Sequence, residues 1–190
     1  MRSAIRIMVL IILSGSLSSC DMIKGLADVE IDTNIEGNLE VITDAAALKS
    51  TEDYGFSGAD TVDVMNDDLE DYAELIKDFH TQSITLRVLS VDSIGGDGEK
   101  IPITGVELLP NTTFGMANDL TAYYWILNQV WAIEEGMSLS LDAASYDAIN
   151  DILKDELPVI FSAVGTCNKG NILFVLNYNL EATVTANPIK

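Results

Sequence analysis

A cysteine near the amino terminus carries the clearest chemical signal in this chain. Residues 17–20 read Leu-Ser-Ser-Cys, and they close an apolar run, Ile7–Leu13, that follows Arg2 and Arg6. Basic, apolar and small-residue regions in this order are typical of a secretory signal. A cysteine at the cleavage point can be acylated on its sulfur and its new amino group. The pattern therefore predicts a mature chain that begins at Cys20 and is held to a membrane by acyl chains.

The alternative for residues 1–19 is an uncleaved membrane helix. The apolar run is shorter than the ~20 residues that a helix needs to cross a bilayer, and four serines and a glycine dilute its end. We therefore divide the chain into a signal peptide, residues 1–19, a lipidated cysteine with a short tether, residues 20–27, and one domain, residues 28–190. Fully extended, the tether reaches about 23 Å, so the domain is expected close to the membrane surface.

Residues able to support catalysis are scarce. The chain has one histidine, His80, and one cysteine besides Cys20, namely Cys167. A nucleophile with an adjacent base, or a zinc site, needs more such side chains close together. Pairs of carboxylates could perform acid–base chemistry, but with 30 acidic residues the number of pairs discriminates nothing. We predict that the protein is not an enzyme, and that Cys167 is a small, partly buried thiol.

The mature chain is strongly acidic. Without Arg2 and Arg6, eight of the ten Lys and Arg residues remain against 30 Asp and Glu, a net charge of −22. This charge excludes nucleic acids and anionic lipid head groups as favoured partners, because both would be repelled. The acidic surface has two interpretations, a solvated face that keeps an exported protein soluble and a face that binds cations.

Calcium is the ion that this composition would favour, because it prefers hard oxygen ligands. Asp92, Asp97 and Glu99 share one glycine-rich loop and are the candidate ligands. Their spacing does not match an EF-hand, and a solvated loop explains them equally well. No other cofactor is predicted besides the lipid on Cys20.

Four aromatic residues are the candidate ligand-binding residues: Tyr123, Tyr124, Trp125 and Trp131. Flat rings with a polar edge can stack on the faces of sugars. In a strand, Tyr124 would lie on one face and Tyr123 with Trp125 on the other, so only one face could bind. The alternative is that these are ordinary core aromatics, since Tyr and Trp are often partly buried.

Alternating apolar and polar residues predict that most of the domain is made of strands. Val29–Ile35 alternates, Gly37-Asn38 is a two-residue turn signal and Leu39–Thr43 resumes the alternation, so we expect a hairpin. Residues 121–127 favour a strand, although they also fit a helix. The further predicted strands are Ile84–Val91, Ile101–Leu109, Met137–Leu141, Val159–Thr166 and Ile172–Ala186.

Two segments change to helical spacing. Residues 67–79 place Leu69, Tyr72, Ile76 and Phe79 on one side, with His80 at the helix end. A second helix starts at Asp142 and stops before Pro158. The last two strands are expected to form a hairpin with a turn at residues 168–170, and the final strand to be central. The fold class is mainly β, a β-rich α+β chain that forms an antiparallel β-sandwich with two short helices.

The chain resembles a group of small, largely uncharacterised lipoproteins from Bacteroidetes. The resemblance is carried by Cys20 close to the first strand, by residues 66–76 leading into Ile84–Val91, and by the closing segment from Gly165 to Pro188. It implies a β-rich sandwich without an assigned activity. Proteins of this group often sit beside glycan-uptake systems, which favours sugar handling slightly.

We therefore predict a lipid-anchored protein of the bacterial cell envelope, on the outer membrane rather than the inner, facing either the periplasm or the cell surface. Its predicted function is a non-catalytic binding module, with a glycan as one ligand. The alternative is a structural or interaction subunit of an envelope protein assembly. An exposed row of aromatics would favour a glycan, and a broad apolar or acidic patch rimmed by polar residues would favour a protein partner.

Overall fold

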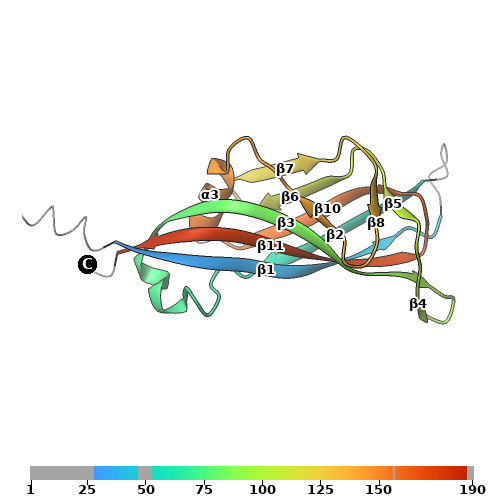
Figure 1. Cartoon of the computed structure of the whole chain (residues 1–190), viewed down its shortest axis with the longest axis horizontal. Coiled ribbons are helices and arrows are strands. Elements are labelled where there is room, and N and C mark those ends of the chain that lie inside the picture. Colours follow the sequence, from blue (N-terminus) through green and yellow to red (C-terminus); the bar gives the residue numbers. More distant parts are fainter. Residues whose placement is uncertain (1–27, 47–52, 156, 188–190) are drawn as a thin grey trace, which may run out of the picture.

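The computed structural model describes residues 28–46, 53–155 and 157–187, so the predicted signal peptide, Cys20 and the tether lie outside the described residues. The described chain is mostly antiparallel β-structure, with a short 3-10 helix, η1 (Glu70–Leu75), and one α-helix, α3 (Asp147–Lys154) (Figure 1). The strands are β1 (Val29–Thr43), β2 (Tyr54–Val62), β3 (Ile76–Ile94), β4 (Lys100–Pro102), β5 (Val106–Leu108), β6 (Thr113–Ala117), β7 (Ala122–Ile126), β8 (Trp131–Ile133), β9 (Ser138–Ser140), β10 (Val159–Cys167) and β11 (Ile172–Ala186).

Strand pairing forms one sheet that curls over itself into two facing layers. One layer contains β4 and β9 on β3, followed by β11 and β1, and the other contains β2, β10, β6 and β7 with β5 and β8. The layers join where the end of β1 pairs with β2 at Ile42–Ser57 and Thr43–Phe56. The predicted mainly β, sandwich-like fold with two short helices is therefore confirmed.

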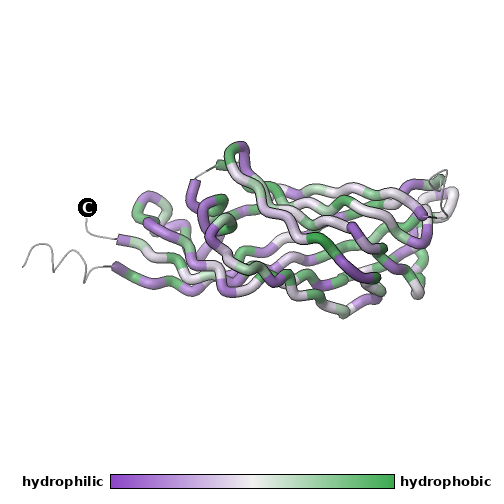
Figure 2. Tube along the Cα trace, turned by 90° about the horizontal axis from the view of Figure 1, so that it is seen from above, coloured by the Kyte–Doolittle hydropathy of each residue, from purple (hydrophilic) through white to green (hydrophobic). Residues whose placement is uncertain are grey.

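The core lies between the two layers, and hydrophobic and hydrophilic positions alternate along the strands that enclose it (Figure 2). The predicted apolar face of β11 is buried throughout: Ile172, Phe174, Leu176, Tyr178, Leu180, Ala182 and Val184. Rings join the layers, because Phe161 of β10 stacks on Tyr178 at 4.6 Å and Phe56 meets Phe174 edge-on at 5.3 Å. β11 pairs with β3 on one side and β1 on the other, which confirms its central position.

The predicted hairpin at Gly37-Asn38 is wrong. β1 continues without a turn from Val29 to Thr43 and pairs with β11 along almost its whole length. Gly37 stands opposite Tyr178, and a Cβ atom at Gly37 would lie only 2.5 Å from Tyr178 Cζ. The glycine is there to admit this ring rather than to turn the chain.

The predicted closing hairpin is also wrong. β10 and β11 follow one another in the chain, but β10 pairs with β2, β5 and β6, whereas β11 pairs with β1 and β3. The turn at residues 168–170 therefore carries the chain from one layer to the other. Both strands have an apolar face, and burial of these faces against each other takes precedence over pairing edge to edge.

Both helices are shorter than predicted. The segment predicted as a helix over residues 67–79 contains only η1, and Ile76 and Phe79 belong to β3. His80 lies exposed within β3 instead of ending a helix. Pairing of β3 with β11 from Ile76 onward replaces the helical hydrogen bonds, so tertiary pairing overrides local periodicity.

The second helix, predicted from Asp142, begins at Asp147, and it buries Ile149, Ile152 and Leu153. β3 extends to Ile94, so Asp92 lies in a strand rather than in a loop, and the predicted strand Ile101–Leu109 is divided into β4 and β5. Residues 121–127 contain β7, as predicted.

Tyr178 is expected to make the free energy of unfolding fall as the pH rises in the alkaline range. Burial raises the pKa of its phenol, and the hydrogen bond that Tyr178 Oη donates to Asp60 Oδ2 at 3.0 Å raises it further. Because the fold favours the protonated phenol, its contribution is complete below pH ~10 and is lost as the pH rises. We expect the urea midpoint to fall more steeply between pH 9 and 11 in the natural protein than in Tyr178→Phe. Equal slopes would contradict this expectation.

Candidate functional site

The candidate site is a groove between the edges of β7 and β9. It is an open hollow of about 540 Å³, within the range of ligand sites. Its walls come from β7 and the turn after it, and from β9 and the residues after it. The lining residues are Tyr123, Tyr124, Trp125, Ile126, Leu127, Asn128, Gln129, Leu139, Ser140, Leu141 and Asp142.

Three of the four predicted aromatic residues line this groove. β7 places them by simple alternation: Tyr124 is 59% exposed, whereas Trp125 is buried and Tyr123 is half-buried. The rings of Tyr123 and Trp125 lie 4.8 Å apart, edge-on, on the inward side. The predicted division of these rings between two faces is therefore confirmed.

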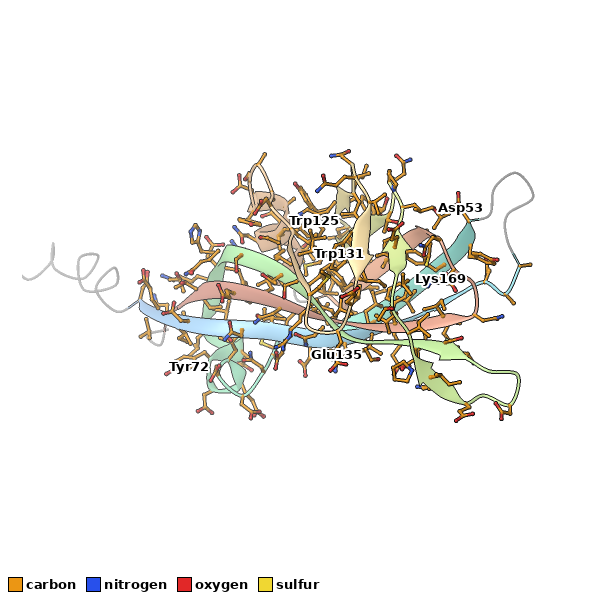
Figure 3. The ribbon with its side chains drawn as sticks, turned by 45° about the vertical axis from the view of Figure 1, so that its right-hand side comes forward. Asp53, Tyr72, Trp125, Trp131, Glu135 and Lys169 are labelled. Atoms are coloured by element: carbon orange, nitrogen blue, oxygen red, sulfur yellow. The ribbon has the colours of Figure 1, made fainter. Side chains whose placement is uncertain are left out.

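The fourth predicted residue, Trp131, lies outside the groove lining. It belongs to β8, which pairs with β5, and its ring meets Phe114 edge-on at 6.2 Å. Trp125 and Trp131 are both seen in the part of the molecule above the long strands, whereas Tyr72, in η1, lies below them (Figure 3). Trp131 is therefore a half-buried packing residue beside the site.

A buried donor in the groove wall was not predicted from the sequence. The Nε1–H of Trp125 is buried and has no hydrogen-bond partner among the described residues. A buried donor left unmatched costs about 1–3 kcal/mol. It is therefore a group that an acceptor on a bound molecule would satisfy.

A surface without charge adjoins the groove, and we name it the neutral face. It is the outward side of β2, β10, β6 and β7, where register aligns Ala59, Ser162, Gly115 and Tyr124 in one row. Its residues are Ser57, Ala59, Thr61, Thr113, Gly115, Ala117, Ala122, Tyr124, Ile126, Ile160, Ser162 and Val164. All of them are uncharged in a chain whose net charge is −20.

Large side chains protrude from the neutral face. Ile126, Ile160 and Val164 are 57%, 46% and 54% exposed. Tyr124 covers Gly115, since a Cβ atom there would lie 2.7 Å from Tyr124 Cδ1. The ring is thus supported from below and presents the rest of its surface to solvent. The result is an uncharged patch in which exposed large apolar side chains alternate with small and polar ones.

A second hollow, of about 450 Å³, lies between η1 and α3. Its walls are mainly apolar, with Met65, Leu153 and Leu157, and they also contain Asp63 and Glu74. No buried donor without a partner is found among the described residues that line it. The groove beside β7 is therefore the stronger candidate.

The predicted calcium ligands are not gathered into a ligand set. Asp92 lies within β3, opposite Pro102 of β4, and Asp97 lies in the turn beyond, where its Oδ1 accepts a hydrogen bond from the Glu99 backbone N–H at 3.2 Å. Over residues 28–46, 53–155 and 157–187, no three His, Cys, Asp or Glu side chains are grouped so that they could hold a metal ion. Calcium binding remains a prediction from composition.

The thiol of Cys167 is fully buried rather than partly buried as predicted, and burial raises its pKa. It is therefore held in the neutral, weakly nucleophilic form. In the part of the chain that the structure describes, no helix is long and apolar enough to cross a bilayer.

Comparison of the sequence with protein families and with curated proteins finds no match. Six chains among the solved structures show a remote likeness, and they include the following two. One, from Desmodium yellow mottle tymovirus, has 10% identity and a TM-score of 0.34, covering 86% of this chain and 83% of the other. The other, the decameric BFDV capsid protein, has 11% identity and a TM-score of 0.29, covering 83% of this chain and 98% of the other. At such TM-scores neither likeness bears on the function of this chain.

Proposed function

We propose that this chain is a lipid-anchored, non-catalytic binding module of the bacterial cell envelope that docks a protein partner through the neutral face. The observation that supports this proposal is the contiguous uncharged patch around Tyr124, Ile126, Ile160 and Val164. An exposed apolar patch of this kind is typical of a protein interaction site. The proposal thus takes up the interaction role that the sequence left open as an alternative.

The chemistry of the patch favours a protein over a glycan. Of the four aromatic residues predicted to bind a sugar, Tyr124 alone is exposed by half or more. The other large side chains, Ile126, Ile160 and Val164, are aliphatic and offer a sugar neither a flat ring nor a hydrogen bond. The cores of protein interfaces are depleted of charge and rich in tyrosine, as this face is.

Charge defines which surface the partner can approach. The chain carries a net charge of −20, so an acidic partner is repelled over most of its surface. The neutral face is free of that charge, while the acidic surroundings attract basic residues at the rim of an interface. We therefore expect a partner with an apolar docking patch and a basic rim, whose association slows as salt is added.

The predicted lipid anchor would determine where the domain meets its partner. Acyl chains on Cys20 and the short tether of residues 20–27, both expected from the sequence, would keep the domain close to its membrane. A partner in the same membrane is then present at a high effective concentration. Outer-membrane attachment is part of the proposal, and the face of the membrane is left open.

Site-specific crosslinking in the native cells tests this proposal. A photoreactive amino acid at position 160 or 164 should give one discrete crosslinked protein, and the same group at position 72, within η1, should not. Adding Val164→Glu to the position 160 variant should reduce that crosslink at least tenfold, because a buried unpaired charge costs more than the ~1.4 kcal/mol that corresponds to a factor of ten.

Leu89→Glu is the matched control, since Leu89 is 39% exposed on β3, in the other layer. It should leave the crosslink unchanged. The same protein crosslinked from positions 72 and 160, or equal yields in the two Glu variants, would contradict docking through the neutral face.

A glycan is the second candidate ligand. The Tyr124 ring lies over Gly115 and presents the rest of its surface to solvent, and exposed flat rings stack on the faces of sugars. A glycan that raised the unfolding midpoint of the natural protein and of Tyr72→Ala, but not of Tyr124→Ala, would replace the protein partner in this proposal.

A further inference from the structure

In the described residues, the groove beside β7 also lies at a break in a ring of paired strands. Pairing runs without interruption from β9 through β3, β11, β1, β2, β10 and β6 to β7. Within the described ranges β7 pairs with β6 alone and β9 with β3 alone. Residues of both strands line the same groove. Two strand edges therefore border one hollow.

The edge of β7 that faces away from β6 carries unpaired main-chain groups. Asn118 N donates to Thr121 O at 2.9 Å, and Leu127 N donates to Thr112 O at 2.8 Å, at the two ends of the β6–β7 pair. Antiparallel pairs alternate between bonded and non-bonded positions. The main chain of Tyr123 and Trp125 therefore bonds to β6, and that of Ala122, Tyr124 and Ile126 is directed outward.

The edge of β9 that faces away from β3 also carries outward main-chain groups. Leu141 N donates to Ile84 O, and Val88 N donates to Met137 O, both at 2.8 Å, on either side of the Leu139–Leu86 pair. By alternation the main chain of Leu139 bonds to β3, whereas that of Ser138 and Ser140 is directed away from β3. Both borders of the groove thus present main-chain donors and acceptors.

The sequence of β7 itself carries no charge or proline that would protect this edge, and the neighbouring element that contacts β7 from outside the sheet is α3. Natural proteins block exposed edges with charged residues, proline or bulges, yet no charged residue and no proline occurs between Asp119 and Glu134. This uncharged stretch contrasts with the rest of the chain, which has thirty acidic residues and a net charge of −20. An edge without such protection is a template for an added strand.

We propose that the groove binds one extended peptide segment of a protein partner as an additional strand between β7 and β9. Regularly repeated main-chain groups match two facing edges at once, which a glycan or an acyl chain cannot do. Alternate side chains of the segment would pack on Trp125, Leu139 and Leu141, and its carbonyl oxygens would enter a groove whose wall holds the unmatched Trp125 Nε1–H.

The charge of the chain selects among such segments. The net charge is −20, and Asp142 lies at the groove itself. We therefore expect apolar residues at alternate positions and Lys or Arg at the flanks. This inference rests on the proposed function in that the ligand is a protein, and it adds the chemistry and the mode of binding.

Selection from a phage-displayed library of random heptapeptides on the purified protein tests the inference, with two variants at one position. Ile126→Pro removes an outward N–H on an edge strand, where proline is tolerated, whereas Ile126→Ala removes only the exposed side chain. Selected peptides should alternate apolar residues and carry basic flanks. Because both variants lose the isoleucine side chain, the comparison isolates the main-chain N–H, and peptide affinity should be at least tenfold lower for Ile126→Pro than for Ile126→Ala.

Hydrogen exchange adds a direct readout: a selected peptide should slow exchange of the Tyr124 and Ser140 amides, and circular dichroism should show Ile126→Pro folded. Absence of any enriched peptide, or equal affinity for both variants, would overturn the inference. A dimer of the protein alone that is lost in Ile126→Pro would also overturn it, making a second copy the occupant. Val164→Glu should leave peptide affinity unchanged, so failure of the neutral face and failure of the groove are distinguishable.

Discussion

Replacing Gly37 by alanine is expected to lower the free energy of unfolding by about 3 kcal/mol. The new Cβ atom would overlap Tyr178 Oη and lie 2.5 Å from Tyr178 Cζ. The ring cannot move aside easily, because it stacks on Phe161 at 4.6 Å and its hydroxyl donates to Asp60 Oδ2 at 3.0 Å. Urea unfolding, followed by circular dichroism, measures the change.

Gly96→Ala is the control for this substitution. A Cβ atom at Gly96 meets nothing within 4 Å, so its free energy of unfolding should change by less than about 0.5 kcal/mol. Adding Tyr178→Leu to Gly37→Ala should cost less than the sum of the two single changes, because the leucine removes the overlapping ring. Similar unfolding midpoints for Gly37→Ala and Gly96→Ala would show that β1 tolerates a side chain at this position.

Truncation of Phe161 to alanine is the second large effect, and we expect it to lower the free energy of unfolding by about 3–5 kcal/mol. Phe161 is fully buried and joins the two layers through its stacked contact with Tyr178. Its loss leaves a cavity at the contact between layers, in addition to the lost transfer of the ring from water. The measurement is again the urea midpoint with its slope.

Ile160→Ala, one residue away on the same strand, is the matched control. Ile160 is 46% exposed on the neutral face, so its truncation should cost less than about 1 kcal/mol. If the two truncations cost the same, the inward side of β10 would not be the core side. This pair of variants therefore tests the orientation of the strand that carries the neutral face.

The candidate site was predicted in part. Alternation in residues 121–127 correctly separated Tyr124 from Tyr123 and Trp125, because side chains in a strand point to opposite faces with a fixed period of two. The neutral face was not predicted, since its residues come from three separate stretches of the sequence, β2, β6 with β7, and β10. The unmatched Nε1–H of Trp125 has no signature in the sequence at all, because it depends on which acceptors surround the ring.

Several strands, β7, β9, β10 and β11 among them, were predictable from the residue pattern, together with their buried faces. The apolar face of β11 from Ile172 to Val184 could be predicted because buried and more exposed side chains alternate along an extended chain. Those patterns are local, and local side-chain periodicity survives whatever the strand pairs with. Which strand edges pair with each other follows only from the folded chain.

The pair Gly37-Asn38 is compatible with a turn or with a straight strand. The straight strand is selected by pairing with β11, whose Tyr178 lies beside Gly37. Likewise, Ile76 and Phe79 fit a helix until β11 offers main-chain partners to them. The groove between β7 and β9 exists because the seven strand pairings that run from β9 through β3 to β7 leave these two edges unpaired. Pairing is a long-range choice among edges with equivalent hydrogen-bonding groups, and the packed core, rather than any local motif, makes that choice.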